Sequence, residues 1–425
     1  FVLSKRQATL LNAYRTPFSR YAGTARYFTR SGVDSLFYEG DVFRQRDLAY
    51  VLRRIRRHGP DGFYRGETAD LIVAEMQRGG GLITHRDLEE YRAIEREPVT
   101  FFYRGHRVIS MGPPSSGGIA LAQLLRAVET VDVVSAGYHS SALVHRMAEA
   151  MRRTYADRSE WLGDPDFVDV PVESLISPAY VDERMSDFNP DRVTPSSTIS
   201  HGSPLEHESH ETTHYSITDR WGNAVSVTTT LNGSFGSHVV VDGAGFFLNN
   251  EMDDFSSKPG SPDMFGLVGN EANSIEPGKR MLSSMTPTIV EEPGGRLFMV
   301  IGSPGGSTII TTVFQVIMNV IDHGMDIQQA VAASRFHHQW LPDELRYERF
   351  ALQPDVVDNL ISRGWSVVER SGVWGRADGI VVSYGQNAEV ITEPSSVESI
   401  SGMSPEGRLY HGGADPRGED VAVGY

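Results

Sequence analysis

The chain has 425 residues, a formal net charge of −16 and 22% charged residues. This negative balance argues against nucleic acid or an anionic membrane surface as a partner, and no apolar run approaches the roughly 20 residues that span a bilayer. The sequence has no cysteine, which excludes thiol catalysis, iron–sulfur clusters and disulfides.

The N-terminal 40 residues have a mixed, irregular pattern. We expect them to cover another element or to be partly loose. Phe1 begins the chain without a methionine or a recognisable signal peptide, which indicates a processed or shortened form.

From Asp41 the first half is predicted to be mainly helical, with one hairpin. Apolar residues recur at helical spacing, and glycine or proline follows the ends of these runs. Thr84 and Asp87 resemble a helix-capping pair for a short helix that continues to Tyr91. The other expected helices are Arg46–Arg57, Glu67–Gln77, Gly118–Glu129 and Ser141–Tyr155, and the expected hairpin strands are Val99–Tyr103 and His106–Ser110.

Residues 159–211 lose this periodicity and gain Pro, Asp and Ser, so we expect an exposed connector that ends at Glu211. The chain then becomes rich in predicted strands, with two helices near residues 307–322 and 327–333. The expected strands are His214–Asp219, Ala224–Thr230, Gly245–Leu248, Pro287–Val290 and Leu297–Ile301. Helices, then antiparallel strands, then helices again favour stacked helix and sheet layers, an α+β class.

Thr212 introduces two short strands joined by a turn at Trp221–Asn223. A threonine hydroxyl is a weak nucleophile unless a base lies beside it, and an N-terminal threonine carries that base as its own α-amino group. Such an amine titrates near pH ~8, where a general base is useful. Taken alone, the stretch also fits an ordinary β-hairpin with exposed threonines.

Several ordered runs decide between these interpretations, because together they closely resemble the γ-glutamyltransferases of the N-terminal nucleophile hydrolase superfamily. The resemblance covers residues from about 40 to the C-terminus. The runs are Thr212–Ser216, Leu248–Phe255, Leu282–Met285, Gly302–Ser307 and Arg335–Asp343, with Gly112–Gly118 and Tyr155–Arg158 in the first half.

The resemblance implies a four-layer αββα sandwich and cleavage of the Glu211–Thr212 bond by the chain itself. Thr212 Oγ would attack the carbonyl of Glu211, and water would hydrolyse the resulting ester. The products would be a large-subunit portion, residues 1–211, and a small subunit, residues 212–425. Both would contribute strands to one intertwined domain, as a heterodimer.

The same resemblance implies catalytic roles in the mature site. Thr212 would form an acyl-enzyme with a γ-glutamyl donor such as glutathione, and water or an amino acid or dipeptide acceptor would release the product. Thr230 matches the family threonine that orients the nucleophile. Gly305 and Gly306 can present backbone N–H groups to the oxyanion without side chains in the way; a phosphate loop is the rival, but its lysine is missing.

Donor recognition is implied by five further residues. Asn232, Glu251 and Asp254 would hold the α-ammonium, and acceptors that include two anions suit a cation. Ser283 and Ser284 would hydrogen-bond the α-carboxylate, which in the family also meets an arginine located ahead of Phe1. Either the sequence is partial, or recognition of the carboxylate is altered.

The segment Lys258–Arg280 resembles the lid loop of many bacterial members, and Phe265 falls where relatives often carry a gating tyrosine. Phenylalanine keeps an aromatic cover but cannot donate a hydroxyl hydrogen bond. The clusters His207–His210 and His337–His338 lack the spacing of a zinc site, so we predict no metal and no cofactor.

Several alternatives stay open. The same nucleophile could serve an acylase of glutaryl or cephalosporin side chains, or a poly-γ-glutamate transpeptidase or depolymerase. The ammonium set favours an amino-bearing donor, and the lid argues against long polymers. An unprocessed, non-catalytic relative is the alternative from another class. By family resemblance, the protein is expected in the periplasm or secreted.

Overall fold

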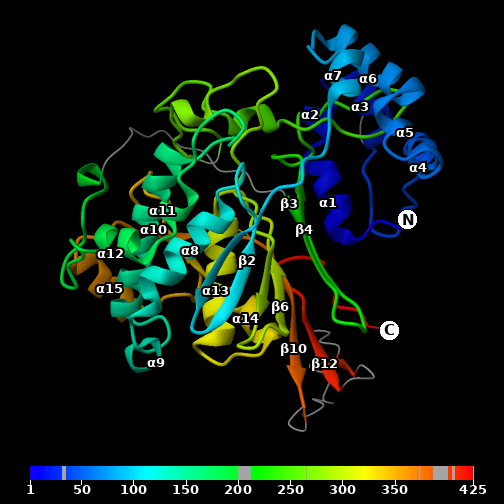
Figure 1. The fold of residues 1–425 in the computed structure, drawn as a ribbon. Coiled ribbons are helices and arrows are strands. Elements are labelled where there is room, and N and C mark those ends of the chain that lie inside the picture. The colour runs from blue at the N-terminus through cyan, green and yellow to red at the C-terminus, as the bar shows by residue number, and fades with distance from the viewer. Residues whose placement is uncertain are drawn as a thin grey trace. The chain divides into compact units, whose positions relative to one another are not determined.

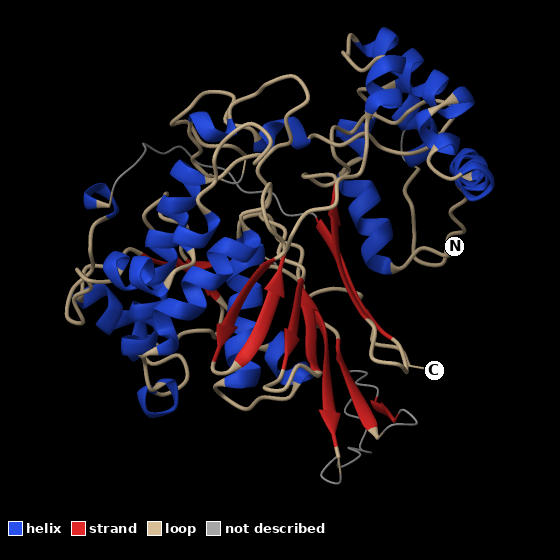
Figure 2. Cartoon of the chain, viewed as in Figure 1, coloured by secondary structure: helices blue, strands red, loops and turns tan. Residues whose placement is uncertain are grey.

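The computed structural model describes residues 1–30, 35–199, 212–264, 266–372, 374–385, 401–403 and 407–424. The chain divides into two compact units. The first comprises Phe1–Glu95 and Gly233–Asn250, and the second comprises Arg96–Asn232 and Glu251–Tyr425. The strands that the structure describes, drawn in red in Figure 2, all belong to the second unit.

The first unit is helical where the structure describes it, and its first residues differ from the expectation. Residues 1–40 were expected to be irregular, but they contain three helices. Ser4 Oγ accepts a hydrogen bond from the Gln7 backbone N–H at 3.1 Å and so starts the first of them. Phe18 and Phe28 are buried against Phe43, and tertiary burial therefore orders a segment with weak periodicity. The helices are α1 (Lys5–Ala13), α2 (Arg15–Phe18) and α3 (Ala22–Phe28).

The later helices of this unit confirm the sequence prediction. Thr84 Oγ1 accepts from the Asp87 N–H, and the Asp87 carboxylate accepts from the Thr84 N–H, which is the expected capping pair. The expected strand Gly245–Leu248 is wrong: only an isolated bridge joins Phe247 to Val240, because left-handed Gly243 and Gly245 turn the chain there. The helices are α4 (Arg46–His58), α5 (Asp61–Tyr64), α6 (Gly66–Gly79) and α7 (His85–Glu90).

The second unit is built on a seven-stranded antiparallel sheet, with the strand order β1-β2-β5-β6-β10-β12-β11. Strands from both sides of Thr212 enter this sheet, since β1 and β2 precede that residue and the other five follow it. The strands are β1 (Val99–Tyr103), β2 (His106–Ser110), β5 (Thr288–Glu291), β6 (Leu297–Gly302), β10 (Asp378–Tyr384), β11 (Ser401–Met403) and β12 (Arg408–Gly413).

Alternating residues of β6 face two different layers, as the period of a strand requires. Met299 and Ile301 belong to the main core, which is completed by three long helices, whereas Val300 belongs to a smaller cluster on the other face. The helices are α8 (Gly117–Glu129), α10 (Ser141–Trp161) and α13 (Thr308–Ile321). In Figure 1 they lie beside the sheet.

A separate hairpin, β3 (Thr212–Thr218) and β4 (Ala224–Thr230), covers the other face of the sheet. Ser226 Oγ links it to two sheet strands, since it donates to the Ile301 carbonyl at 3.0 Å and accepts from the Thr288 N–H at 3.1 Å. Helices, main sheet and hairpin are thus three successive layers, and three of the four expected layers can be followed in this unit.

Helix α10 is longer than predicted and changes how the connector is interpreted. It continues to Trp161 and buries Arg158, and short helices α11 (Val172–Leu175) and α12 (Pro178–Arg184) follow. Much of residues 159–199 is therefore ordered structure, whereas residues 200–211 lie outside the described ranges.

The C-terminal region adds elements that the sequence did not predict. A three-stranded sheet is formed by β7 (Phe336–His337), β8 (Leu345–Glu348) and β9 (Val367–Arg370), and it is accompanied by α15 (Pro354–Ser362). The helix expected near residues 327–333 is present as α14 (Ile327–Ala332). None of the helices in the described ranges is long and apolar enough to cross a bilayer.

Candidate active site

The hairpin places Thr212 directly opposite Thr230. These residues are Cα partners in the β3–β4 register, and Thr212 Oγ1 donates to Thr230 Oγ1 at 3.2 Å. Thr230 Oγ1 also accepts from the Asn232 backbone N–H at 2.8 Å. Because a hydroxyl oxygen has two acceptor lone pairs, Thr230 connects the side chain of Thr212 with the backbone of Asn232.

His214 anchors strand β3 against the main sheet. Its Nδ1 lies 2.9 Å from Thr228 Oγ1, its Nε2 lies 3.1 Å from Ser216 Oγ, and burial lowers its pKa to about 4. A Cβ on Gly302 would come within 2.2 Å of the imidazole ring, so glycine at this position lets β6 approach β3. The neutral imidazole is thus a packing group of the strand that carries Thr212.

A tight glycine turn separates β6 from α13. Gly305 and Gly306 have φ values of 138° and 54°, a region that favours glycine. The Thr308 hydroxyl donates to the Gly305 carbonyl at 2.8 Å, and Ser303 Oγ accepts from the Arg376 N–H at 3.1 Å. The turn therefore has a fixed conformation at the positive end of a 14-residue helix.

Ser283 and Ser284 lie on a segment that is clamped by the loop before α8. Ser116 donates its N–H at 2.8 Å and its hydroxyl at 2.7 Å to the Ser283 carbonyl, and the Pro114 carbonyl accepts from the Ser283 N–H at 2.9 Å. A Cβ on Gly117 would meet the Met285 carbonyl oxygen at 2.3 Å. The run Gly112–Gly118 thus holds the serine pair.

Acidic residues occupy the short 3-10 helix η2 (Glu251–Asp254). Burial raises the pKa of Glu251 to about 7. The pKa of Asp254 is raised well above its usual value, mainly by burial and then by the charges of Asp263 and Glu251. Burial therefore opposes ionisation of these carboxyl groups, and a cation beside them would favour their charged forms.

Arg158 is a site residue to which sequence reasoning gave no role. It lies in the last turn of α10, where its Nε donates to Ser116 Oγ at 3.1 Å and its Nη2 donates to Ser284 Oγ at 3.3 Å. Tyr155 of the same run donates to the Ser307 carbonyl. The signal was present, because both residues belong to the Tyr155–Arg158 motif.

One cleft brings most of these groups together. Its lining includes seven of the residues proposed from sequence and adds Arg158 and Asp263. The seven are Thr212, Thr230, Asn232, Asp254, Ser283, Ser284 and Gly306. Gly305 and Glu251 are next to the cleft residues but are not part of its lining. Gly305 directly precedes Gly306 in the glycine turn. The charge of Glu251 helps to raise the pKa of Asp254.

Two of the expected residues cannot be placed, because Glu211 and Phe265 lie outside the described residues. Within the described ranges, no group of three or more His, Asp or Glu side chains is arranged to hold a metal. His337 contacts Thr311 Oγ1 and Gln339 Oε1, both at 2.8 Å, and His338 contacts Asp343 Oδ1 at 3.1 Å. Cluster His207–His210 is likewise outside the described residues.

Three comparisons with known proteins bear on this site. The family model described as gamma-glutamyltranspeptidase matches residues 1–425. The chain belongs to the γ-glutamyltranspeptidase family. It is 46% identical over 388 residues to the glutathione hydrolase proenzyme of Escherichia coli (strain K12), covering 91% of this chain and 63% of that protein.

A second relative of this γ-glutamyltranspeptidase family member is the glutathione hydrolase proenzyme of Pseudomonas aeruginosa, 47% identical over 388 residues, with 90% of this chain and 65% of that protein covered. The chain thus spans less than two thirds of the length of both curated relatives. A cephalosporin acylase from Bacillus halodurans superposes with a TM-score of 0.79 at 24% identity, covering 100% of this chain and 72% of that one. This likeness confirms an α+β fold of the N-terminal nucleophile hydrolase type.

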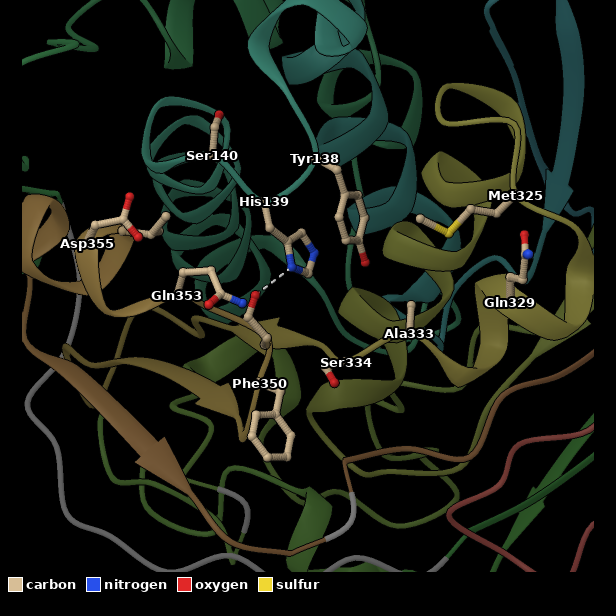
Figure 3. Close-up of a pocket in the computed structure, with 12 residues that line it drawn as sticks. Tyr138, His139, Ser140, Met325, Gln329, Ala333, Ser334, Phe350, Gln353 and Asp355 are labelled. Atoms are coloured by element: carbon tan, nitrogen blue, oxygen red, sulfur yellow. Dashed lines mark hydrogen bonds between the residues drawn. The ribbon is translucent and has the colours of Figure 1, made fainter.

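This γ-glutamyltranspeptidase family member also has a larger cavity of about 500 Å³, drawn in Figure 3. The rings of Tyr138 and His139 stack there with centroids 3.9 Å apart, and His139 Nδ1 lies 2.8 Å from the Ala351 carbonyl oxygen. Burial lowers the pKa of His139 to about 4. None of the residues lining this cavity lines the Thr212 cleft, and His139 is therefore not a base for that threonine.

Proposed function

We propose that this chain is the catalytic part of a self-cleaving γ-glutamyltransferase and glutathione hydrolase. The observation that carries the proposal is the cleft in which Thr212 meets Ser284, Asp254 and Gly306. It combines a nucleophile, groups for both charged ends of a glutamyl unit, and a helix start for the developing oxyanion. Family membership and the two glutathione hydrolase proenzymes support the same reaction.

Maturation is the first proposed step. Thr212 Oγ attacks the carbonyl carbon of Glu211, and the acyl group moves from nitrogen to oxygen. Water then hydrolyses this ester, which leaves a carboxylate on Glu211 and a free amine and hydroxyl on Thr212. The Thr212–Thr230 contact of 3.2 Å supports this step, since Thr230 can orient the attacking hydroxyl.

Turnover uses the new amine as a base. It accepts the proton of Thr212 Oγ while the oxygen attacks the γ-carbonyl carbon of the donor. Backbone N–H groups of Gly305 and Gly306 stabilise the oxyanion, and the leaving amine departs with a proton. Water then releases glutamate from the acyl-enzyme, whereas an amino acid or dipeptide amine gives a new γ-glutamyl compound.

Cleavage would yield residues 1–211 and 212–425 as two subunits of a heterodimer. The shared seven-stranded sheet supports their continued association, because β1 and β2 precede the bond and β5, β6 and β10 follow it. Separating them would expose the main core. The family resemblance supports a periplasmic or secreted location, which fractionation of the native host would test.

Electrophoresis and two anilide substrates test the function. We expect two bands near half the mass, a new N-terminus that begins at Thr212, and release of the chromophore from a γ-glutamyl anilide. Thr212→Ala should abolish both cleavage and turnover, whereas Thr213→Ala, an exposed neighbour, should retain both. One persistent full-length band without turnover would support the non-catalytic relative, and a preference for a glutaryl anilide would support an acylase.

A further inference from the structure

Arg158 differs from two arginines that precede it on α10, Arg152 and Arg153. Both are buried and contact carboxylates: Arg152 lies 2.8 Å from Glu149, and Arg153 lies 2.6 Å from Asp187. Arg158 is only 5% exposed, yet its hydrogen bonds go to the hydroxyls of Ser116 and Ser284. Among the described residues it makes no ion pair within 4 Å.

A guanidinium group only donates hydrogen bonds, and this fixes the role of Ser284. Ser284 Oγ accepts from Arg158 Nη2, so the hydroxyl hydrogen of Ser284 must point to another acceptor. Ser283 is in the same situation, because its Oγ accepts from the Met285 N–H at 3.1 Å. Both hydroxyls are therefore free to donate to the cleft, and such a pair suits an anion.

The charge of Arg158 strengthens this preference. Burial lowers the pKa of its guanidinium, whereas the charges of Asp263 and Asp254 favour the protonated form. A buried cation whose direct contacts are neutral hydroxyls is incompletely compensated. An anionic group bound at Ser284 would supply the missing negative charge.

We propose that Arg158 is the positioning residue through which the cleft selects donors that carry an α-carboxylate. It holds Ser284 as a hydrogen-bond donor, fixes Ser116 against the Ser283 carbonyl, and supplies a positive charge at that end of the cleft. This proposal rests on the proposed function, since the anion in question is the α-carboxylate of the γ-glutamyl donor.

Two anilide donors that differ only in this carboxylate test the proposal. The γ-glutamyl anilide carries it, and the 4-aminobutanoyl anilide keeps the amine and lacks it. A hydrogen bond to a charged group corresponds to roughly 10–100-fold in affinity. In Arg158→Gln we expect kcat/KM for the γ-glutamyl donor to fall at least tenfold, and kcat/KM for the 4-aminobutanoyl donor to stay within about threefold.

Two further variants separate positioning from general damage. Arg158→Lys keeps the charge but cannot donate to both hydroxyls from one planar fork, so its preference should be intermediate. Arg146→Gln is the matched control, because Arg146 lies on α10 roughly 18 Å along the helix and donates only to the Ala127 carbonyl. It should leave the donor preference unchanged. Equal losses on both donors, or an unchanged preference in Arg158→Gln, would overturn the proposal.

Binding gives an independent measurement if no variant turns over. Calorimetry of the wild-type protein should show L-glutamate binding at least tenfold more tightly than 4-aminobutanoate. Absence of this preference overturns the role of Arg158 even in an active enzyme. Absence of cleavage and turnover together with the preference overturns the proposed function alone.

Discussion

The two ends of the Thr212 cleft are built by different physical means. At one end, Ser283 and Ser284 are held by hydrogen bonds from the Ser116 loop and from Arg158, with donors already arranged. At the other end, Glu251 and Asp254 have raised pKa values, mainly because burial disfavours their charged forms. In the proposed function, the serine end is preorganised for an anion, whereas the acidic end would become fully charged beside a cation. We therefore expect geometry to limit binding at the serine end and proton loss to limit it at the acidic end.

The largest expected effect comes from disturbing the preorganised end. In Gly117→Ala the new methyl group would meet the Met285 carbonyl oxygen at 2.3 Å and push the serine segment out of place. We expect kcat/KM for a γ-glutamyl donor to fall at least about 100-fold, because small misplacements are costly at a reacting site. Overpacking should also destabilise the fold by about 1–3 kcal/mol.

Kinetics and thermal unfolding together measure this effect. Gly79→Ala is the control, because a Cβ there meets nothing within 4 Å and Gly79 lies in helix α6. A Gly117→Ala protein with unchanged kinetics would show that the serine end tolerates movement and is not preorganised.

The next effect comes from removing a charge at the acidic end. Asp254→Asn keeps the shape but cannot ionise to meet the donor ammonium. We expect about a 30-fold loss in kcat/KM for the γ-glutamyl anilide, in the range of a charge-assisted hydrogen bond. The glutaryl anilide, which lacks the ammonium, should be affected much less.

Asp253→Asn provides the neighbouring control, since Asp253 is exposed and accepts a hydrogen bond from the Met264 N–H at 2.8 Å. A similar loss on both donors in Asp254→Asn would mean that Asp254 supports the fold of the cleft and does not recognise the ammonium.

A pH dependence should distinguish the two ends directly. Burial raises the pKa of Glu251 to about 7, and a bound ammonium would favour its ionised form. Below about pH 7 a proton must leave on binding, so donor affinity should fall by up to about tenfold per pH unit as pH decreases. Above that value the affinity should become independent of this group.

Glu251→Gln should reduce this dependence to the part that comes from Asp254, whose pKa is also raised, while lowering the affinity at high pH. Calorimetry with L-glutamate between pH 5.5 and 8.5 would measure both effects. A wild-type profile that is flat across this range would contradict a titrating acidic end.

The smallest effect is expected from one hydroxyl of the serine pair. Ser283→Ala removes a single neutral donor but leaves Ser284 and Arg158 in place. We expect about a 3–10-fold rise in KM for the γ-glutamyl donor, with kcat nearly unchanged. A loss of kcat/KM as large as that expected for Gly117→Ala would show that Ser284 does not contribute to binding the donor carboxylate independently of Ser283.

Regular parts of the fold were predictable because their signals are local. The capping pair at Thr84, the hairpin Val99–Tyr103 with His106–Ser110, and the helix after Ser307 all follow from periodicity and turn residues. The helices in residues 1–40 were not predictable from local signals, because they depend on burial of Phe18 and Phe28 against aromatic residues that are distant in the chain. The C-terminal three-stranded sheet was missed for a similar reason. Strand β7 has only two residues, and β9 pairs in parallel with β8, from which it is separated in the chain by helix α15.

The candidate site shows the same division. Thr212, the glycine turn and the serine pair could be named from motifs, because each run is contiguous in the chain. The role of Arg158 could not be inferred from its motif, because Ser284 lies 126 residues away in the chain and only the fold brings the two residues together. The raised pKa values of Glu251 and Asp254 also depend on burial, which no local pattern reports.

The sequence by itself determined the family, the candidate nucleophile and the chemical types of the groups around it, because side-chain chemistry and short motifs are local properties. Only the tertiary structure decided which of these groups share a cleft, which hydroxyls are held as donors and which carboxyls lose their charge. Those properties come from long-range packing and from the exclusion of water, and both arise when distant segments of the chain meet.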